Sequence, residues 1–174
     1  MADITPRPGL SIALPDMPPT PLHARLDACG SDAQALLTTF EDICAERFGV
    51  MLFTVLQWDP SRDEIQRVHS NDPDHYPMGV WKPMGPTPWG AELLKAGRAV
   101  LCHDEAELRW AFPDADLLVR LDCVANLSAP VCQNGRVLGV ASISNVSGHY
   151  MSNDLALYAT LVQYLVPVFS KTSL

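Results

Sequence analysis

The chain has 174 residues, of which 48% are hydrophobic and 18% charged, so it can bury the core of one domain. Its 12 basic and 20 acidic side chains give a formal net charge of −8. This acidity, with no basic cluster, excludes nucleic acid and anionic membrane surfaces as partners, and no apolar stretch approaches the roughly 18 residues that span a bilayer.

Residues 1–22 form a proline-rich arm that carries six of the 15 prolines. Proline fixes φ and cannot donate a hydrogen bond to a sheet, so we expect an extended arm ahead of a single domain over residues 23–174. Two interpretations stay open for the arm. It is either a loose tail or a strap whose segment LSIAL contacts a neighbouring subunit.

Three regular segments follow the arm. Residues 31–48 are predicted to form a helix, because Ser31 or Asp32 can cap it and apolar residues recur every three to four positions. The apolar run VMLFTVLQW, residues 50–58, is typical of a buried strand. The mixed segment 65–70 is predicted to be a more exposed strand.

The middle of the chain, residues 71–123, is predicted to be largely irregular because prolines and glycines interrupt it. Within it, Thr87 can cap a short helix that begins at Pro88 and ends before Gly97. A short strand over 98–102 and two further helical pieces, 104–112 and 114–121, complete the segment.

The segment LSAPVCQNGRVLGVASIS, residues 127–144, predicts a hairpin. Its Asn134-Gly135 pair suits a type I′ turn, which needs positive φ at both central positions. A last helix is expected over 152–169 with Ser152 as its cap. Since this helix is apolar on two sides, the first helix or a second subunit must cover the second side.

This order of elements predicts an α+β fold. An antiparallel sheet of about six strands would carry the terminal helices on one face and the irregular middle on the other. The hairpin, the strand 50–58 and the unit TPWGAELLKAGRAVLC resemble those of the GAF domain family, over roughly residues 25–170. The segment HYPMGVWKPMGPTPWG is similar to that of small stand-alone GAF proteins.

The resemblance implies a GAF/PAS-like fold with a pocket between the sheet and the short middle helices. It also implies a small-molecule ligand and a homodimer formed through the terminal helices. No cofactor and no fused output module are expected. A metabolite-binding or sensing protein is thus the favoured function, with enzymatic activity left open.

The candidate ligand site is a pocket lined by aromatic and polar side chains of residues 69–128. Tryptophan bodies are apolar while the indole N–H needs a partner, which suits the wall of a pocket for a partly polar ligand. Lys82 and Arg120 can hold a carboxylate. The aromatics can equally fill the core as a ligand-free scaffold. The predicted site residues are Tyr76, Trp81, Lys82, Trp89, Trp110, Arg120, Asp122, Asn126 and Ser128.

A redox enzyme is the alternative function. One GAF-like group reduces free methionine-(R)-sulfoxide with cysteines, and Cys102 and Cys123 lie in the comparable region. The family's other cysteine positions are occupied here by MGPTPWG, and nearby Asp104 and Asp122 oppose thiolate formation. Buried structural cysteines are therefore the favoured interpretation. The adjacent Cys102 and His103 resemble a bilin-attachment pair, but their sequence context differs.

No metal site is predicted. Asp72, Asp74 and His75 lie close together, but SNDPDHYP is typical of a turn-rich loop whose side chains bond their own backbone. The five cysteines are widely spaced without a CxxC pair, which argues against disulfides and zinc and favours a cytoplasmic location.

Overall fold

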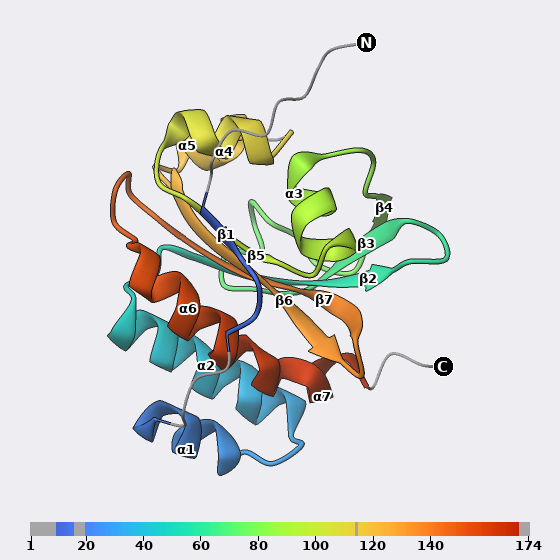
Figure 1. The fold of residues 1–174 in the computed structure, drawn as a ribbon, viewed down its shortest axis with the longest axis vertical. Helices are drawn as coiled ribbons and strands as arrows, with labels where there is room; N and C mark the ends of the chain where they lie inside the picture. The colour runs from blue at the N-terminus through green and yellow to red at the C-terminus, as the bar shows by residue number, and fades with distance from the viewer. Residues whose placement is uncertain (1–9, 16–19, 114, 171–174) are drawn as a thin grey trace.

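The computed structural model describes residues 10–15, 20–113 and 115–170, which form a seven-stranded sheet with helices on both faces (Figure 1). The strands are β1 (Leu10–Ile12), β2 (Leu52–Asp59), β3 (Glu64–Ser70), β4 (Trp81–Pro83), β5 (Ala99–Cys102), β6 (Ala125–Gln133) and β7 (Arg136–Asn145). The helices are α1 (Pro21–Asp27), α2 (Ala33–Arg47), α3 (Pro88–Gly90), the π-helical turn η1 (Ala91–Lys95), α4 (Glu105–Ala111), α5 (Ala115–Arg120), α6 (Ser152–Leu161), the 3₁₀ turn η2 (Val162–Leu165) and α7 (Val166–Phe169).

The strands lie in the order β1-β5-β6-β7-β2-β3-β4, and every neighbouring pair is antiparallel. At the centre, β6 and β7 form the predicted hairpin. Asn134 and Gly135 have φ of 52° and 75°, as a type I′ turn requires. The hairpin therefore lies in the middle of the sheet, where both of its faces are covered.

Two layers of helices cover the sheet, one on each face. α1, α2, α6, η2 and α7 lie on one side, while α3, η1, α4 and α5 lie on the other (Figure 1). Because successive strand residues point to opposite faces, Leu127 and Ala129 of β6 join the core under the terminal helices. Asn126 and Ser128, which alternate with them along β6, face the opposite layer. The predicted α+β, GAF/PAS-like architecture is confirmed.

Side-chain caps start the helices where the sequence predicts. The Asp32 carboxylate accepts hydrogen bonds from the backbone N–H groups of Gln34 and Ala35, at 3.0 and 3.1 Å. Thr87 Oγ1 accepts from Gly90 N at 3.0 Å, and Asp104 Oδ1 from Glu107 N at 3.0 Å. Each cap satisfies N–H groups that have no partner inside their own helix.

The C-terminal helix differs from its prediction. α6 begins at Ser152, and the residue before it, Met151, donates its N–H to Asp154 Oδ2 at 2.9 Å, so Ser152 is the first helical residue and not the cap. The helix is also divided into α6, η2 and α7, because Pro167 has no N–H and its ring would clash with the carbonyl four residues earlier. On the second apolar side, the Tyr164 ring lies 5.6 Å from that of His23 in α1, a short helix that the sequence analysis did not predict.

Two short strands were missed in proline-containing segments. β1 lies in the predicted arm and pairs with β5 of the same chain, and Ser11 Oγ donates to Glu92 Oε2 of η1 at 2.8 Å. The LSI segment therefore pairs with the chain's own sheet. β4 lies in the segment predicted to be irregular and pairs with β3. Residues 1–9 and 16–19 of the arm lie outside the described residues.

None of the helices within the described ranges is long and apolar enough to cross a membrane.

Candidate ligand-binding site

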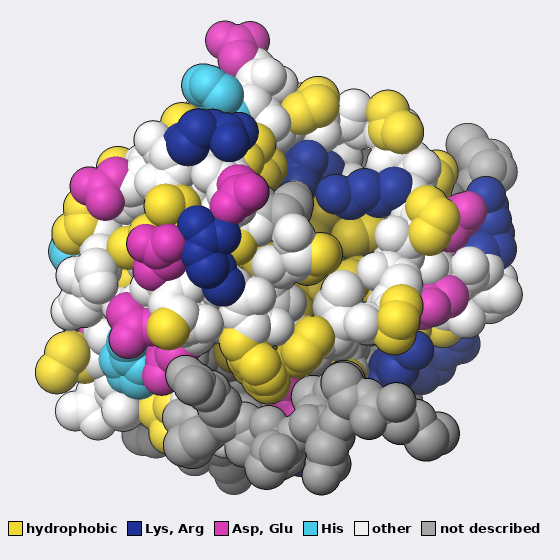
Figure 2. Space-filling model, turned by 90° about the horizontal axis from the view of Figure 1, so that it is seen from above, with side chains coloured by type: hydrophobic (Ala, Val, Ile, Leu, Met, Phe, Trp, Pro, Cys, Tyr) yellow, Lys and Arg dark blue, Asp and Glu magenta, His cyan; other side chains and the backbone are white. Residues whose placement is uncertain are grey.

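A cavity of about 190 Å³ lies between the sheet and the middle segment. An engineered apolar cavity of about 150 Å³ holds benzene, which has six heavy atoms, so this one has room for a molecule of roughly eight or nine. From above, the molecule shows a hollow with hydrophobic side chains inside it and basic side chains beside it (Figure 2). The lining residues are Leu52, Thr54, Leu56, Ile65, Arg67, Tyr76, Lys82, Pro83, Met84, Thr87, Trp89, Phe112, Pro113, Leu118, Asn126, Ser142 and Ser144.

The floor of the cavity is a polar patch on three adjacent strands. Thr54 of β2 is the register partner of Ser142 of β7, which is also the partner of Ser128 of β6. One step along, Ser144 is opposite Asn126. Residues paired in register share a face of the sheet, so all five polar side chains point to the middle layer. All five are buried.

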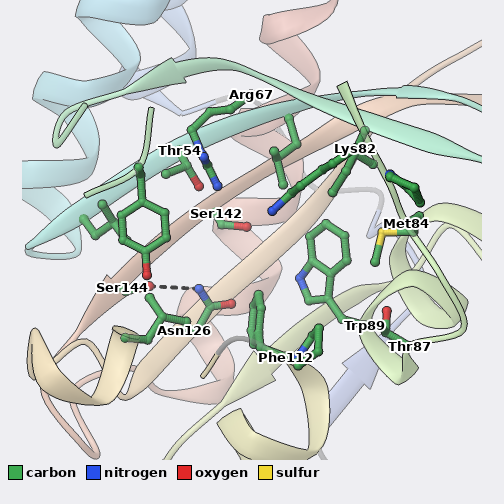
Figure 3. A pocket seen from close by; sticks show the side chains of 17 residues that line it. Thr54, Arg67, Lys82, Met84, Thr87, Trp89, Phe112, Asn126, Ser142 and Ser144 are labelled. Carbon is green, nitrogen blue, oxygen red and sulfur yellow. Dashed lines mark hydrogen bonds between the residues drawn. The ribbon is translucent and has the colours of Figure 1, made fainter. Parts of the chain in front are cut away.

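Hydrogen bonds join four of these side chains to Trp89 of α3. Trp89 Nε1 donates to Ser128 Oγ at 3.3 Å, and Ser128 Oγ donates to Asn126 Oδ1 at 2.6 Å. Ser142 Oγ lies 2.7 Å from Ser128 Oγ. Asn126 Nδ2 donates to Ser144 Oγ at 3.0 Å, the bond drawn in Figure 3. The network fixes the side-chain orientation of the floor and anchors α3 to the sheet.

The walls are mainly apolar. Trp89 is 3% exposed, and its ring lies 5.8 Å from that of Phe112 with the planes tilted by 45°. Met84 and Thr87 lie beside Trp89, and Leu118 of α5 adds a further aliphatic surface. An apolar body of a ligand can therefore contact aromatic and aliphatic side chains on several sides.

Two basic side chains extend into the cavity. Arg67 of β3 and Lys82 of β4 point toward the same part of it, near Ser142 (Figure 3). Arg67 Nη1 donates to the Pro77 carbonyl at 3.0 Å, and the Arg67 guanidinium carbon lies 5.0 Å from the centre of the Tyr76 ring. These two contacts hold the Arg67 side chain in place. Lys82 makes no ion pair with any described residue. None of the described lining residues is Asp or Glu, so the cavity favours an anion.

A second, open hollow of about 210 Å³ adjoins the cavity and shares Arg67, Tyr76 and Lys82 with it. Its remaining lining comes from the 75–80 segment and α5, namely His75, Pro77, Val80 and Leu117. His75 Nδ1 lies 2.8 Å from Asp72 Oδ2. The two basic residues therefore stand where the outer hollow meets the inner cavity.

The structure brings some of the predicted site residues together and separates others. Tyr76, Lys82, Trp89 and Asn126 line the cavity. Ser128 does not line it but is part of the polar floor, where its Oγ lies 2.7 Å from Ser142 Oγ. Four others do not line it: Trp81, Trp110, Arg120 and Asp122.

Those four residues have other surroundings. Trp81 packs against Arg62, whose guanidinium carbon lies 5.9 Å from the ring centre. The Trp110 indole N–H is buried and has no hydrogen-bond partner among the described residues. Arg120 and Asp122 are exposed, and Asp122 has a positive φ of 57° after the end of α5. Arg67 therefore occupies the second basic position that the sequence analysis gave to Arg120.

Several lining residues were missed by the sequence analysis. Thr54, Ser142 and Ser144 are polar residues within largely apolar parts of β2 and β7, and strand periodicity places Ser142 and Ser144 on one face. A polar residue on a face expected to be buried is the signal that could have identified them. Arg67 shares its face of β3 with Ile65 by the same alternation.

The cysteines are separate from the cavity. None of the five lines it, and burial followed by the charge of Glu107 raises the pKa of Cys102 to about 12. Burial, followed by the charge of Asp122, raises the pKa of Cys123 to about 11. Both therefore hold their protons at neutral pH, whereas the nucleophilic form of cysteine is the thiolate. Within the described ranges, no group of three or more His, Cys, Asp or Glu side chains could hold a metal ion.

The sequence profile described as "GAF domain" matches residues 31–168. No curated protein matches the chain significantly in sequence. Among solved structures, the chain is similar to the free methionine-R-sulfoxide reductase of Neisseria meningitidis in complex with its substrate, with a TM-score of 0.61, 18% identity and coverage of 86% of this chain and 84% of that one.

Two GAF domains of phosphoenolpyruvate-protein phosphotransferases have similar folds, each with a TM-score of 0.65 and coverage of 86% of this chain. The domain from Coxiella burnetii is 13% identical and is covered over 86% of its length. The domain from Acinetobacter is 16% identical and is covered over 90%. At these identities the likeness establishes the fold alone.

Proposed function

The chain belongs to the GAF domain family, whose fold implies a ligand-binding or sensing domain, and we propose that it binds a small organic acid in the cavity beneath residues 71–123. Binding would order this segment over the ligand. The change would reach the terminal helices through the sheet that both layers share.

The composition of the cavity lining is the main support for an acidic ligand. Arg67 and Lys82 extend into a hollow that no described Asp or Glu lines. A carboxylate bound there would be close to two positive charges, although the protein as a whole has a net charge of −8. The apolar walls would hold the rest of the molecule, and the volume suits a molecule of roughly eight or nine heavy atoms.

Thermal-shift measurements with a panel of small monocarboxylic acids test this proposal. An acid present at about 100 times its Kd stabilises the native state by about 2.7 kcal/mol, which raises the Tm by several degrees. Lys82→Met should weaken binding about tenfold, because it removes one of the two charges. Lys95→Met is the matched control, since Lys95 is an exposed lysine outside the cavity. Equal weakening by both variants would contradict the proposed site.

Two alternative functions, a ligand-free scaffold and a reductase, each predict a different experimental result. A ligand-free scaffold requires the cavity to be filled by aromatic side chains, and no acid or other metabolite would then raise the Tm. A reductase acting on free methionine sulfoxide requires reactive thiols. Replacing both Cys102 and Cys123 by serine would abolish the activity of such an enzyme, whereas ligand binding in the cavity would persist.

A homodimer through the terminal helices and a cytoplasmic location stay predictions. Sedimentation equilibrium of the full chain tests the dimer. A monomer over the micromolar range would contradict the predicted homodimer.

A further inference from the structure

We propose that the ligand is a 2-hydroxy carboxylic acid, with its carboxylate at Arg67 and Lys82 and its hydroxyl donating a hydrogen bond to Ser142 Oγ. This inference rests on the proposed function and deepens it. It depends on the direction of the hydrogen bonds in the cavity floor, which determines whether Ser142 presents a donor or an acceptor to the ligand.

Asn126 fixes which groups donate and which accept in the hydrogen bonds of the floor. One end of its side-chain amide lies 3.3 Å from the main-chain oxygen of Ile143, which can only accept, so that end is the donating Nδ2. The other end is therefore the acceptor Oδ1, which lies 2.6 Å from Ser128 Oγ. Ser128 must donate its single proton to Asn126.

The donor role of Ser142 follows from the bonds that Ser128 already makes. The indole N–H of Trp89 can only donate, so Ser128 Oγ accepts from it at 3.3 Å. Since the Ser128 proton is already used, the contact of 2.7 Å between Ser128 and Ser142 has Ser142 as its donor. The Ser142 proton thus points away from the ligand space. Its oxygen, which lines the cavity, presents only lone pairs there.

The neighbouring hydroxyls of Ser144 and Thr54 can donate a hydrogen bond to a ligand, unlike that of Ser142. Ser144 Oγ accepts from Asn126 Nδ2, which leaves its proton for another acceptor. Thr54, paired in register with Ser142, is 7% exposed and makes no hydrogen bond among the described side-chain contacts. The floor therefore offers an acceptor beside two donors. A ligand hydroxyl matches this arrangement, because one group can donate to Ser142 and accept from Thr54 or Ser144.

The other common substituents beside a carboxylate fit less well. A keto oxygen has no proton and would place its lone pairs against those of Ser142. An ammonium group can donate, but it would lie near Arg67 and Lys82 without any described acidic residue in the lining to balance it. An unsubstituted acid would leave the buried Ser142 oxygen without a partner on the ligand side, which costs binding free energy.

Calorimetric titration with matched acids tests the inference. The probes are 4-methylpentanoate, leucine and the separate enantiomers of 2-hydroxy-4-methylpentanoate. One enantiomer of the hydroxy acid should bind about tenfold more tightly than the unsubstituted acid, as one good hydrogen bond provides. The amino acid should bind most weakly.

Ser142→Ala should reduce that preference to less than about twofold, mainly by weakening the hydroxy acid. Ser70→Ala is the matched control, since Ser70 is a buried serine of β3 that does not line the cavity, and it should leave the preference unchanged. Ser142→Cys keeps the side-chain volume with a much weaker acceptor. It provides the same test if the alanine variant does not fold.

The outcomes separate this inference from the proposed function. Equal affinity for hydroxy and unsubstituted acids in the unmodified protein, or a preference that survives Ser142→Ala, overturns the assignment to Ser142 while the organic-acid site stands. Binding of none of the acids overturns both.

Discussion

The two faces of the central sheet are built from alternate residues of the same strands, yet only one of them leaves space. On the face covered by the terminal helices, large side chains such as Phe40, Phe53 and Tyr158 are fully buried and in ring contact. On the other face, Asn126 and Ser142 are buried as well, but they border a cavity of about 190 Å³. Burial therefore does not distinguish the two faces.

The layers that cover the two faces explain the difference. The terminal layer includes the 15-residue helix α2, which can bring a whole apolar side onto the sheet. The middle layer consists of helical pieces of three to seven residues joined by turns. Short pieces cannot cover a flat sheet completely, and the polar floor limits apolar contact further. The molecule thus combines a stable support with a face suited to ligand binding.

Matched leucine deletions on the two faces should show the largest difference. Leu127 of β6 is fully buried under the terminal helices, and Leu127→Ala should lower the free energy of unfolding by about 4 kcal/mol. Leu56 of β2 already borders the cavity, so Leu56→Ala should cost only about 2 kcal/mol, because fewer contacts are lost. Urea denaturation measures both. Equal losses would mean that the cavity face is packed as densely as the other.

Removal of one polar group should have a smaller effect, confined to the cavity face. Ser128→Ala leaves Trp89 Nε1 and Asn126 Oδ1 without their partner and should lower the free energy of unfolding by about 1–3 kcal/mol. It should also weaken acid binding, since the floor loses its fixed orientation. Ser61→Ala, at an exposed turn, serves as the control and should change stability by less than about 0.5 kcal/mol. An equally mild effect at Ser128 would show that the network does not hold the floor.

The smallest effect is a dependence of stability on alkaline pH. Burial raises the pKa of Cys102 from 9.0 to about 12, so above pH 9 the unfolded chain loses this proton while the native protein keeps it. The unfolded state is then favoured, and the free energy of unfolding falls as pH rises from 9 toward 12. Between pH 8.5 and 9.5 the loss from this thiol is below about 1 kcal/mol. In Cys102→Ala the decline should be shallower, and an identical slope would contradict the buried, protonated thiol.

The parts of this molecule that sequence reasoning could predict are those with local causes. The cap at Asp32, the turn at Asn134-Gly135 and the apolar strand before Asp59 each depend on neighbouring residues, and the structure has all three. The three-residue strands β1 and β4 were missed, because so short a segment shows no alternation and is stabilised only by its distant partner.

Sequence reasoning identified the lining residues only where an aromatic, basic or polar residue lay in the segment 69–128. Trp89, Lys82 and Asn126 were identified on that basis and line the cavity. Arg120 was preferred to Arg67 because it lies in the irregular segment, whereas Arg67 belongs to a strand whose facing could not be determined before its register was known. The acceptor character of Ser142 depends on contacts across 14 residues and more, which no local pattern encodes.

The crystal structure of the protein in complex with 2-hydroxy-4-methylpentanoate tests the central claim most directly. We expect electron density for the acid inside the cavity, with its carboxylate within hydrogen-bonding distance of Arg67 or Lys82 and its branched alkyl chain beside Trp89 and Phe112. An acid bound elsewhere on the surface, or a cavity closed by the Trp89 and Phe112 side chains, would contradict the account.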